Sequence, residues 1–218
     1  MTPVPPIAVQ PDRNCPLCPR LADFRAGNRK SYPDWHNAPV DSFGPTDARL
    51  LIVGLAPGLK GANRTGRPFT GDYAGDLLYR TLIDFGFAEG SYGQRLDDGL
   101  RLVDCRITNA VRCVPPENKP TPLEIKTCRP FLSGEIAAAG RLRAILALGR
   151  IAHDSTVAAL GQRPAAVKFG HGARHAILHG PTLFDSYHCS RYNTQTGVLT
   201  EAMFRQVIGQ IAAFLKSA

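Results

Sequence analysis

Four short apolar runs alternate along the chain with longer segments in which apolar residues recur at helical spacing. The runs occupy residues 49–56, 103–111, 144–148 and 181–188, and their branched apolar residues predict strands buried on both faces. Helical spacing begins at about Asp72, Thr121, Gly149 and Thr200. Strands that alternate with helices predict an α/β fold, a three-layer α/β/α sandwich with a central, mainly parallel four-stranded sheet.

Local signals set several of the helix boundaries. Thr121, Pro122 and Glu124 predict an N-cap, a first-turn proline and a capping box. Gly161 is expected to end the helix that begins at Gly149. The whole chain, 1–218, is expected to form one domain, with the proline-rich residues 1–12 as a loosely held arm.

Composition and charge narrow the functional class. No apolar run approaches the roughly 18 residues that span a bilayer, and no cleavable signal sequence is recognised, so we expect a soluble, cytoplasmic protein. The 26 basic residues exceed the 18 acidic ones and give a formal net charge of +8, which favours a polyanionic partner such as nucleic acid. A basic surface that serves only solubility is the alternative.

Four of the six cysteines have the spacing of a metal site. Cys15 and Cys18 form a CxxC pair, and Cys113 and Cys128 follow far along the chain. Four thiolates can complete a zinc site or an iron–sulfur cluster, and the absence of a second CxxC favours an Fe4S4 cluster over a zinc ribbon. Buried thiols or disulfides are the alternative. Cys105 lies in a predicted strand and is expected to be a small buried residue.

Candidate chemistry gathers at the ends of the predicted strands, where ligands bind in parallel sheets. The first strand leads into a glycine-rich loop, residues 54–72, that contains two arginines and a lysine but lacks the Gly-Lys-Ser/Thr ending of a P-loop. The last strand ends at His188 beside Cys189. Neighbouring strand residues point to opposite faces, so His188 is not expected to activate Cys189 as a nucleophile.

Five separate blocks carry a resemblance to a known family. They are the Gly-Leu-Ala-Pro-Gly loop, Gly-Ala-Asn-Arg-Thr-Gly-Arg-Pro-Phe-Thr-Gly-Asp, Ile-Thr-Asn-Ala-Val-Arg-Cys with its Pro-Pro-x-Asn-Lys-Pro tail, the four cysteines, and His-Cys-Ser-x-x-Asn-x-x-Thr-Gly. In this order they resemble the family-five (type B) uracil-DNA glycosylases. The resemblance implies a monofunctional DNA glycosylase that flips uracil, or another deaminated base, out of DNA and hydrolyses the N-glycosidic bond. It also implies a structural Fe4S4 cluster on the four cysteines and a protein that acts as a monomer.

The resemblance implies a role for each block. The family pattern lacks the usual water-activating residue in the first loop, and Asp72 is the candidate to position water or stabilise the sugar cation, unless it only caps a helix. His188 would hydrogen-bond the uracil O2 as negative charge develops there. The other substrate-binding candidates are Ala56, Pro57, Gly58, Phe69 as the base-stacking ring, Asn109 as the reader of the base edge, and Asn118. The DNA-binding candidates are Arg64, Arg67, Ser190, Arg191 and Tyr192.

Two alternatives stay open at this point. A glycosylase that also nicks DNA through a lysine amine could use Lys60 or Lys119, although neither replaces a catalytic residue of the family. A nucleic-acid-binding module stabilised by an iron–sulfur cluster, without catalysis, would use the strand-end loops only to grip phosphates.

Overall fold

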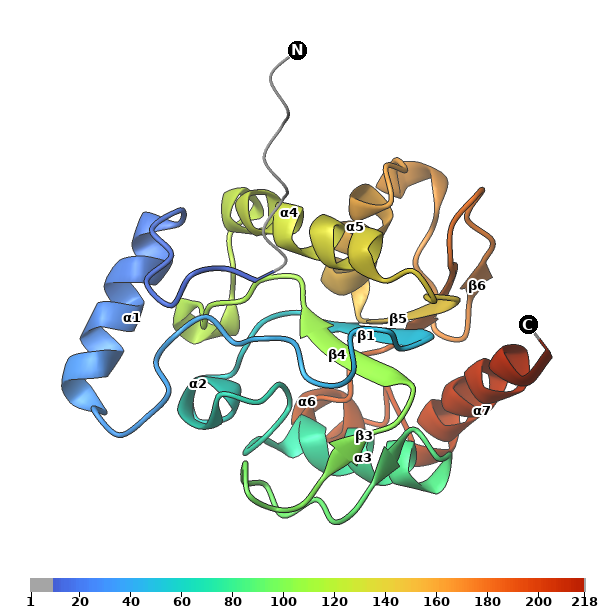
Figure 1. Ribbon diagram of the computed structural model, residues 1–218, viewed down its shortest axis with the longest axis horizontal. Helices are drawn as coiled ribbons and strands as arrows, with labels where there is room; N and C mark the ends of the chain where they lie inside the picture. Colours follow the sequence, from blue (N-terminus) through green and yellow to red (C-terminus); the bar gives the residue numbers. More distant parts are fainter. Residues whose placement is uncertain (1–9, 218) are drawn as a thin grey trace.

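A computed structural model describes residues 10–217 of the chain (Figure 1). Its central sheet has the strand order β4-β1-β5-β7-β6. The strands are β1 Leu50–Gly54, β4 Cys105–Asn109, β5 Ala144–Leu148, β6 Arg174–His175 and β7 Thr182–Ser186, with a separate hairpin of β2 Ala88–Glu89 and β3 Arg101–Leu102. The helices are α1 Pro19–Ser31, α2 Ala62–Thr65, α3 Tyr73–Asp84, α4 Pro122–Ala138, α5 Arg150–Ala159, α6 Arg191–Gln195 and α7 Glu201–Ser217, with single 3-10 turns at Pro116–Asn118 and Pro164–Ala166.

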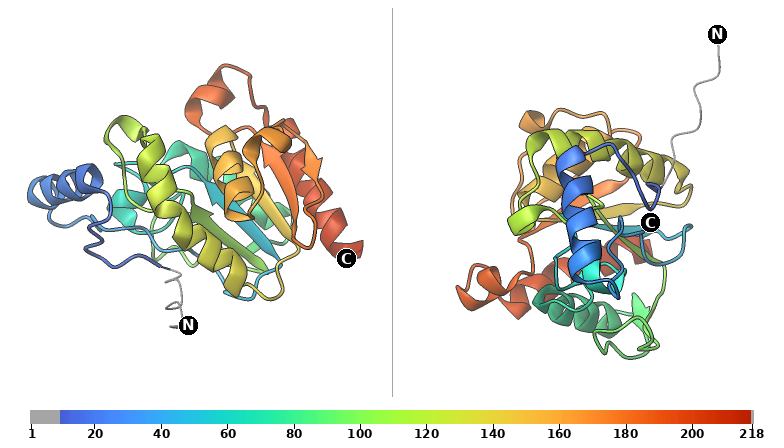
Figure 2. Two further views of the ribbon diagram at one scale, coloured as in Figure 1. Left: turned by 90° about the horizontal axis from the view of Figure 1, so that it is seen from above. Right: turned by 90° about the vertical axis from the view of Figure 1, so that its left-hand side faces the viewer.

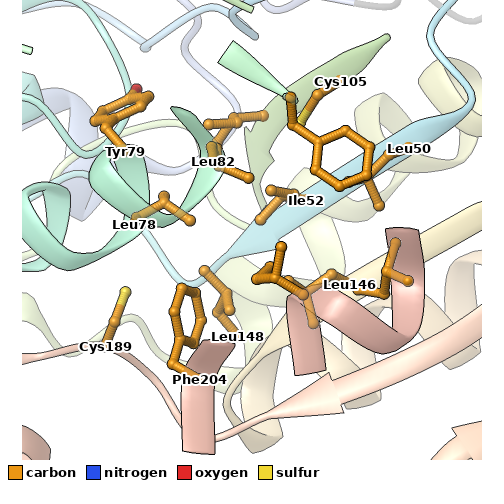
Figure 3. Packing of buried hydrophobic residues seen from close by; sticks show 14 of the residues in the cluster. Leu50, Ile52, Leu78, Tyr79, Leu82, Cys105, Leu146, Leu148, Cys189 and Phe204 are labelled. Carbon is orange, nitrogen blue, oxygen red and sulfur yellow. The ribbon is translucent and has the colours of Figure 1, made fainter. Parts of the chain in front are cut away.

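Helices cover both faces of the sheet, as a three-layer sandwich requires. α3 and α7 pack on one face and α4 and α5 on the other (Figure 1). Alternate residues of each strand enter different cores: Ile52 packs with Leu78 of α3 and Phe204 of α7, while Leu51 enters the core beneath α4 and α5. Figure 3 shows the first of these cores. Because both faces of each strand are buried, the strands are apolar at nearly every position and not only at every second one.

The sequence predicted this architecture, but the strand count needs a correction. The sheet has five strands because the two residues of β6 pair antiparallel with β7 at its edge. A strand of two residues leaves no readable pattern of apolar residues. The predicted capping box of α4 is confirmed: the Thr121 side chain accepts from the Glu124 amide at 3.3 Å, and the Glu124 carboxylate accepts from the Thr121 amide at 2.7 Å.

Strand order places the switch point of the fold at β1. The chain passes from β1 through α3 to β4 on one side and then through α4 to β5 on the other side of β1. Crossovers that diverge in this way open a crevice beyond the carboxyl ends of the strands, where open α/β sheets bind their ligands. Gly54 and Asn109 lie opposite each other in the parallel register of β1 and β4, so both reach this edge.

The N-terminal region needs separate description. Residues 1–9 of the predicted loose arm lie outside the described residues. The rest of the arm is held in place: Pro11 is buried, and the Gln10 side chain accepts a hydrogen bond from Arg112 at 2.9 Å. α1 lies beside the sandwich (Figures 1 and 2) and packs through Leu21 against Val111 and two of the cysteines. Within residues 10–217, no helix is long and apolar enough to cross a membrane.

Candidate active site and cysteine cavity

A small deep pocket lies at the carboxyl edge of the sheet. It brings together seven of the residues singled out in the sequence, namely Ala56, Pro57, Gly58, Phe69, Asp72, Asn109 and His188. They come from the loop after β1, from the loop that leads into α3, from the last residue of β4 and from the segment after β7. The pocket therefore assembles segments more than 100 residues apart in sequence.

Asp72 is the acidic group of the deep pocket. It occupies the N-cap position of α3, but its side chain makes no capping hydrogen bond. Burial raises the pKa of its carboxyl, an effect that the nearby amides of Gly75 and Ala74 oppose and that Asp76 reinforces. Among the described residues, the buried Oδ1 of Asp72 has no hydrogen-bond partner. One oxygen of the carboxylate thus remains free to accept a hydrogen bond from a ligand.

His188 and Asn109 provide polar groups of a different kind. Burial lowers the pKa of His188 to about 4, so its imidazole is neutral at pH 7 and keeps one N–H donor. The Phe69 ring lies beside it, with centroids 5.9 Å apart and the two planes at 28°. Asn109 is buried, and its Oδ1 has no partner within residues 10–217. A ligand with paired donors and acceptors would satisfy these groups.

A wider outer cleft opens from the deep pocket. Asp72 and His188 line both, and the cleft adds Asn118, Ser190 and Arg191. Ser190 also caps α6 by accepting from the Asn193 amide at 3.4 Å, and Arg191 lies over the Tyr73 ring at 5.3 Å. Figure 2 shows α6 standing out from the body of the molecule. The shape suits a ligand whose reacting part enters the deep pocket while a larger part remains outside.

The four spaced cysteines also converge. Cys15, Cys18, Cys113 and Cys128 line one cavity between α1, α4 and the segment after β4, and all six cysteines of the chain are free thiols. Burial raises the pKa of Cys18 to about 11 and that of Cys113 to about 12. Such thiols stay protonated at pH 7 unless a cation holds them as thiolates. Convergence of this kind is typical of a metal site.

Sulfur spacing bears on which metal would fit. Tetrahedral zinc, with Zn–S bonds of about 2.3 Å, places its sulfurs about 3.8 Å apart. Within the described part of the chain, only His153, His175 and Asp185 bring three ligand atoms within 4.8 Å of one another. No three of the four cysteine sulfurs therefore lie within 4.8 Å of one another in this arrangement of the side chains.

The side chains of His153, His175 and Asp185 already bind one another and are not available as metal ligands. His153 Nδ1 lies 2.7 Å from Asp185, and its Nε2 lies 2.8 Å from the Val167 carbonyl. Both ring nitrogens face acceptors, so both must donate, and no lone pair is left for a metal. His175 donates to the other oxygen of Asp185 at 2.9 Å. This network ties the segment before β7 to the strand.

Comparison with known proteins agrees with the geometry. The Uracil DNA glycosylase superfamily matches residues 42–212, which include every strand and the deep pocket. The chain belongs to this superfamily. It is 45% identical over 200 residues to the Type-5 uracil-DNA glycosylase of Thermus thermophilus, covering 89% of this chain and 90% of that protein. The Type-5 uracil-DNA glycosylase of Pyrobaculum aerophilum is 38% identical over 204 residues, covering 92% and 88%.

A more distant match helps to place the chain within the superfamily. The Type-4 uracil-DNA glycosylase of Pyrobaculum aerophilum is 34% identical over 152 residues, covering 69% of this chain and 63% of that protein. The chain is thus more similar to the two Type-5 proteins, as the sequence blocks predicted.

Among the DNA-contact candidates of this superfamily member, Arg67 requires a correction. Its side chain is 3% exposed and pairs with Asp98, itself 3% exposed, through two hydrogen bonds of 2.9 and 2.6 Å. A guanidinium enclosed in this way does not reach DNA. Arg64 is exposed on α2, outside the residues that line the two cavities, and Tyr192 on α6 is 74% exposed.

Sequence reasoning also missed residues of the outer cleft. Gln94 reaches the cleft from the β2–β3 hairpin loop, where its amide donates to Asp76 at 2.8 Å. No motif pointed to this loop, because its position depends on the packing of the hairpin against α3. Tyr73 lines the cleft directly after Asp72, and its place in the chain beside a predicted catalytic residue was the available signal.

Proposed function

We propose that this protein excises uracil from DNA by hydrolysing the N-glycosidic bond and leaves an abasic site. The observation that carries the proposal is the deep pocket, in which Phe69, Asp72, Asn109 and His188 meet at the switch point of a uracil DNA glycosylase superfamily fold. A base inside a duplex cannot reach such a pocket, so the nucleotide must leave the stack. The names of the two Type-5 relatives support uracil as the base.

In the proposed complex, the flipped base stacks on Phe69. The Asn109 amide reads the base edge, which in uracil presents an N–H donor beside a carbonyl acceptor. The backbone of Ala56, Pro57 and Gly58 forms the adjoining wall. Other deaminated bases present related edges, and we include them in the proposed substrate class.

The proposed chemistry divides between the two ends of the breaking bond. As the C1′–N1 bond breaks, its electron pair moves to the base, and the neutral His188 donates a hydrogen bond to the uracil O2. Asp72 stabilises the positive sugar and orients water, whose oxygen bonds to C1′ while its proton leaves to solvent. Asn118, at the mouth of the outer cleft, is a second candidate for holding this water.

For DNA binding we propose the outer cleft and its rim. Arg191 and Ser190 line the cleft, Arg64 lies exposed on α2, and the exposed ring of Tyr192 on the projecting α6 would enter the gap that flipping leaves. The net charge of +8 supports attraction to phosphates. We further propose that the protein acts as a cytoplasmic monomer.

For the cysteine cavity we propose an Fe4S4 cluster held by Cys15, Cys18, Cys113 and Cys128. Besides the sulfur spacing, two N–H groups face the sulfurs: Arg25 donates to Cys113 at 3.5 Å, and the Arg112 amide donates to Cys128 at 3.4 Å. Arg25 is 5% exposed and forms no salt bridge within residues 10–217, so an anionic thiolate cluster would balance its charge. The cluster would act structurally by joining α1 to α4.

One assay tests the proposed activity against its alternatives. A labelled uracil-containing duplex is incubated with the protein and divided between hot alkali and no treatment. Breakage only after alkali is expected. Breakage without alkali would identify a lyase that uses a lysine such as Lys60 or Lys119. An intact strand under both treatments would favour the other alternative, a nucleic-acid-binding module without catalysis.

A further inference from the structure

Phe69 has an unusual backbone for an aromatic residue. Its φ is +53°, in the left-handed region, which costs a residue with a Cβ about 1–2 kcal/mol. Such a conformation persists only when surrounding contacts hold it. The carbonyl of Pro68 accepts from the Tyr79 hydroxyl at 2.5 Å, and that of Phe69 accepts from the Tyr92 hydroxyl at 2.9 Å. The buried Tyr79 and the half-buried Tyr92 thus hold successive peptide groups.

Glycines on both sides leave Phe69 little freedom. A Cβ on Gly54, at the end of β1, would lie 2.6 Å from Cζ of the Phe69 ring. A Cβ on Gly75, in the first turn of α3, would overlap both the Phe69 carbonyl and the Tyr92 hydroxyl. The ring tip rests against the sheet and the carbonyl against the helix that begins beside Asp72. A small shift of this carbonyl would therefore move the ring.

Arg67 connects this segment to the hairpin loop that carries Tyr92. Its Nε donates to Thr70 at 2.7 Å, its two terminal nitrogens bind Asp98, and its guanidinium lies 5.9 Å from the centre of the Tyr92 ring. Asp98 also accepts from the amides of Gly93 and Leu100 at 2.9 and 3.1 Å. The ion pair therefore fixes the loop that follows Tyr92, beginning at the next residue, Gly93, and at the same time orders the segment of Phe69.

We propose that Tyr92 is a positioning residue of the excision reaction: its hydroxyl, held in place by the Arg67–Asp98 pair, fixes the Phe69 ring for stacking on the flipped base. Tyr92 does not line the deep pocket, so it acts through Phe69 and not on the base itself. The inference rests on the stacking role of Phe69 in the proposed function. It also gives the buried Arg67 a function that does not involve DNA contact.

A double-mutant cycle tests this inference. Tyr92→Phe removes one hydroxyl and keeps the ring that packs against Arg67. Single-turnover excision of uracil at subsaturating enzyme should slow by about tenfold, the scale of one lost buried hydrogen bond. In a Phe69→Ala background the same change should have no further effect, because residues that act through one another are not additive. Thr156→Val is the matched control, since it removes a buried hydroxyl that donates to the Ala152 carbonyl on α5 at 2.8 Å.

The outcomes separate the inference from the proposed function. An equal slowing by Tyr92→Phe in both backgrounds, or no slowing in the wild-type background, would overturn the positioning role. Thr156→Val should leave the rate unchanged while it lowers the melting temperature, and an equal rate loss there would attribute the Tyr92 effect to stability alone. A fully active Phe69→Ala enzyme would overturn the stacking role itself and with it this inference, whereas uracil excision by the wild-type protein would still stand.

Discussion

Replacing Asp72 with asparagine should lower activity without lowering stability. The substitution keeps the size of the side chain and removes its charge. Since burial raises the pKa of this carboxyl, the folded protein binds the Asp72 proton more tightly than the unfolded chain does, and keeping the group charged at pH 7 costs stability. The free energy of unfolding of Asp72→Asn at pH 7 should therefore equal or exceed that of the wild type.

The expected rate loss follows from the position of the carboxylate. Opposite charges about 4 Å apart at an effective dielectric constant of about 20 interact by about 4 kcal/mol. If the sugar cation of the transition state forms at that distance from Asp72, losing the charge slows excision by about 10³-fold, because each 1.36 kcal/mol is a factor of about ten. Measured losses of single preorganised contacts, about 10²–10³-fold, are on the same scale.

The assay combines single-turnover excision of uracil from a duplex with urea unfolding of the same samples. In the wild type the rate should fall as pH drops through the raised pKa of Asp72, above the ordinary aspartate value, and Asp72→Asn should lack this acid limb. His188 stays neutral down to about pH 4 and adds no loss above it. Full activity of Asp72→Asn would refute the assignment and leave water held by Asn118 as the next candidate. Lower stability of the variant would refute the burial argument.

Four further predictions concern other parts of the molecule. His188→Ala should slow uracil release by about 10²–10³-fold while duplex affinity, measured by fluorescence anisotropy, is retained; a tenfold loss of affinity would place His188 in DNA binding instead. Replacing any of Cys15, Cys18, Cys113 or Cys128 by serine should lower the iron content of anaerobically purified protein and its melting temperature, whereas Cys105→Ser should leave iron unchanged, and stoichiometric zinc in the wild type would contradict the cluster. Burial alone would lower the pKa of His153, but the hydrogen bonds to Asp185 and Val167 outweigh it, so the pKa is raised. The free energy of unfolding should therefore fall as pH rises from about 6.5 through that raised pKa. In His153→Gln, the urea midpoint should depend less on pH over this range. Glu135 accepts from Arg106 and Arg112 at 2.6 Å each, so Glu135→Gln should cost about 3–5 kcal/mol of unfolding free energy, and a loss below about 1 kcal/mol would show that the buried pair is not a major source of stability.

Three residues of the deep pocket could be placed in the chain from the sequence because each lies at the boundary of a readable element. Asn109 ends a strand, His188 follows one, and Asp72 precedes a helix with a clear apolar stripe. Parallel strands deliver their carboxyl ends to one edge, so the loop that ends at Asp72 and the segment of His188 were expected at one site, and the family resemblance added Asn109. The fold class was predictable for the same reason, since long apolar runs and helical spacing do not depend on distant partners.

Arg67 shows what the sequence could not provide. An arginine in a loop rich in glycine and basic residues is indistinguishable there from one that contacts phosphate. Its burial depends on Asp98, 31 residues away, and on aromatic rings from α3 and the hairpin loop. The two-residue strand β6 was missed for a related reason, because its pairing with β7 is set by tertiary packing and not by its own residues.

Buried polar groups in two parts of the molecule differ in how completely they are paired. Between α4 and β4, the buried Glu135 accepts from two arginines, one of which, Arg112, also donates to Ser42. At the carboxyl ends, Asp72 and Asn109 each keep a buried oxygen without a partner within residues 10–217, and Phe69 holds a strained backbone. Unpaired and strained groups lower stability, so a fold keeps them where a ligand completes them. The paired cluster under α4 stabilises the sheet that holds the unpaired groups of the deep pocket in position for chemistry.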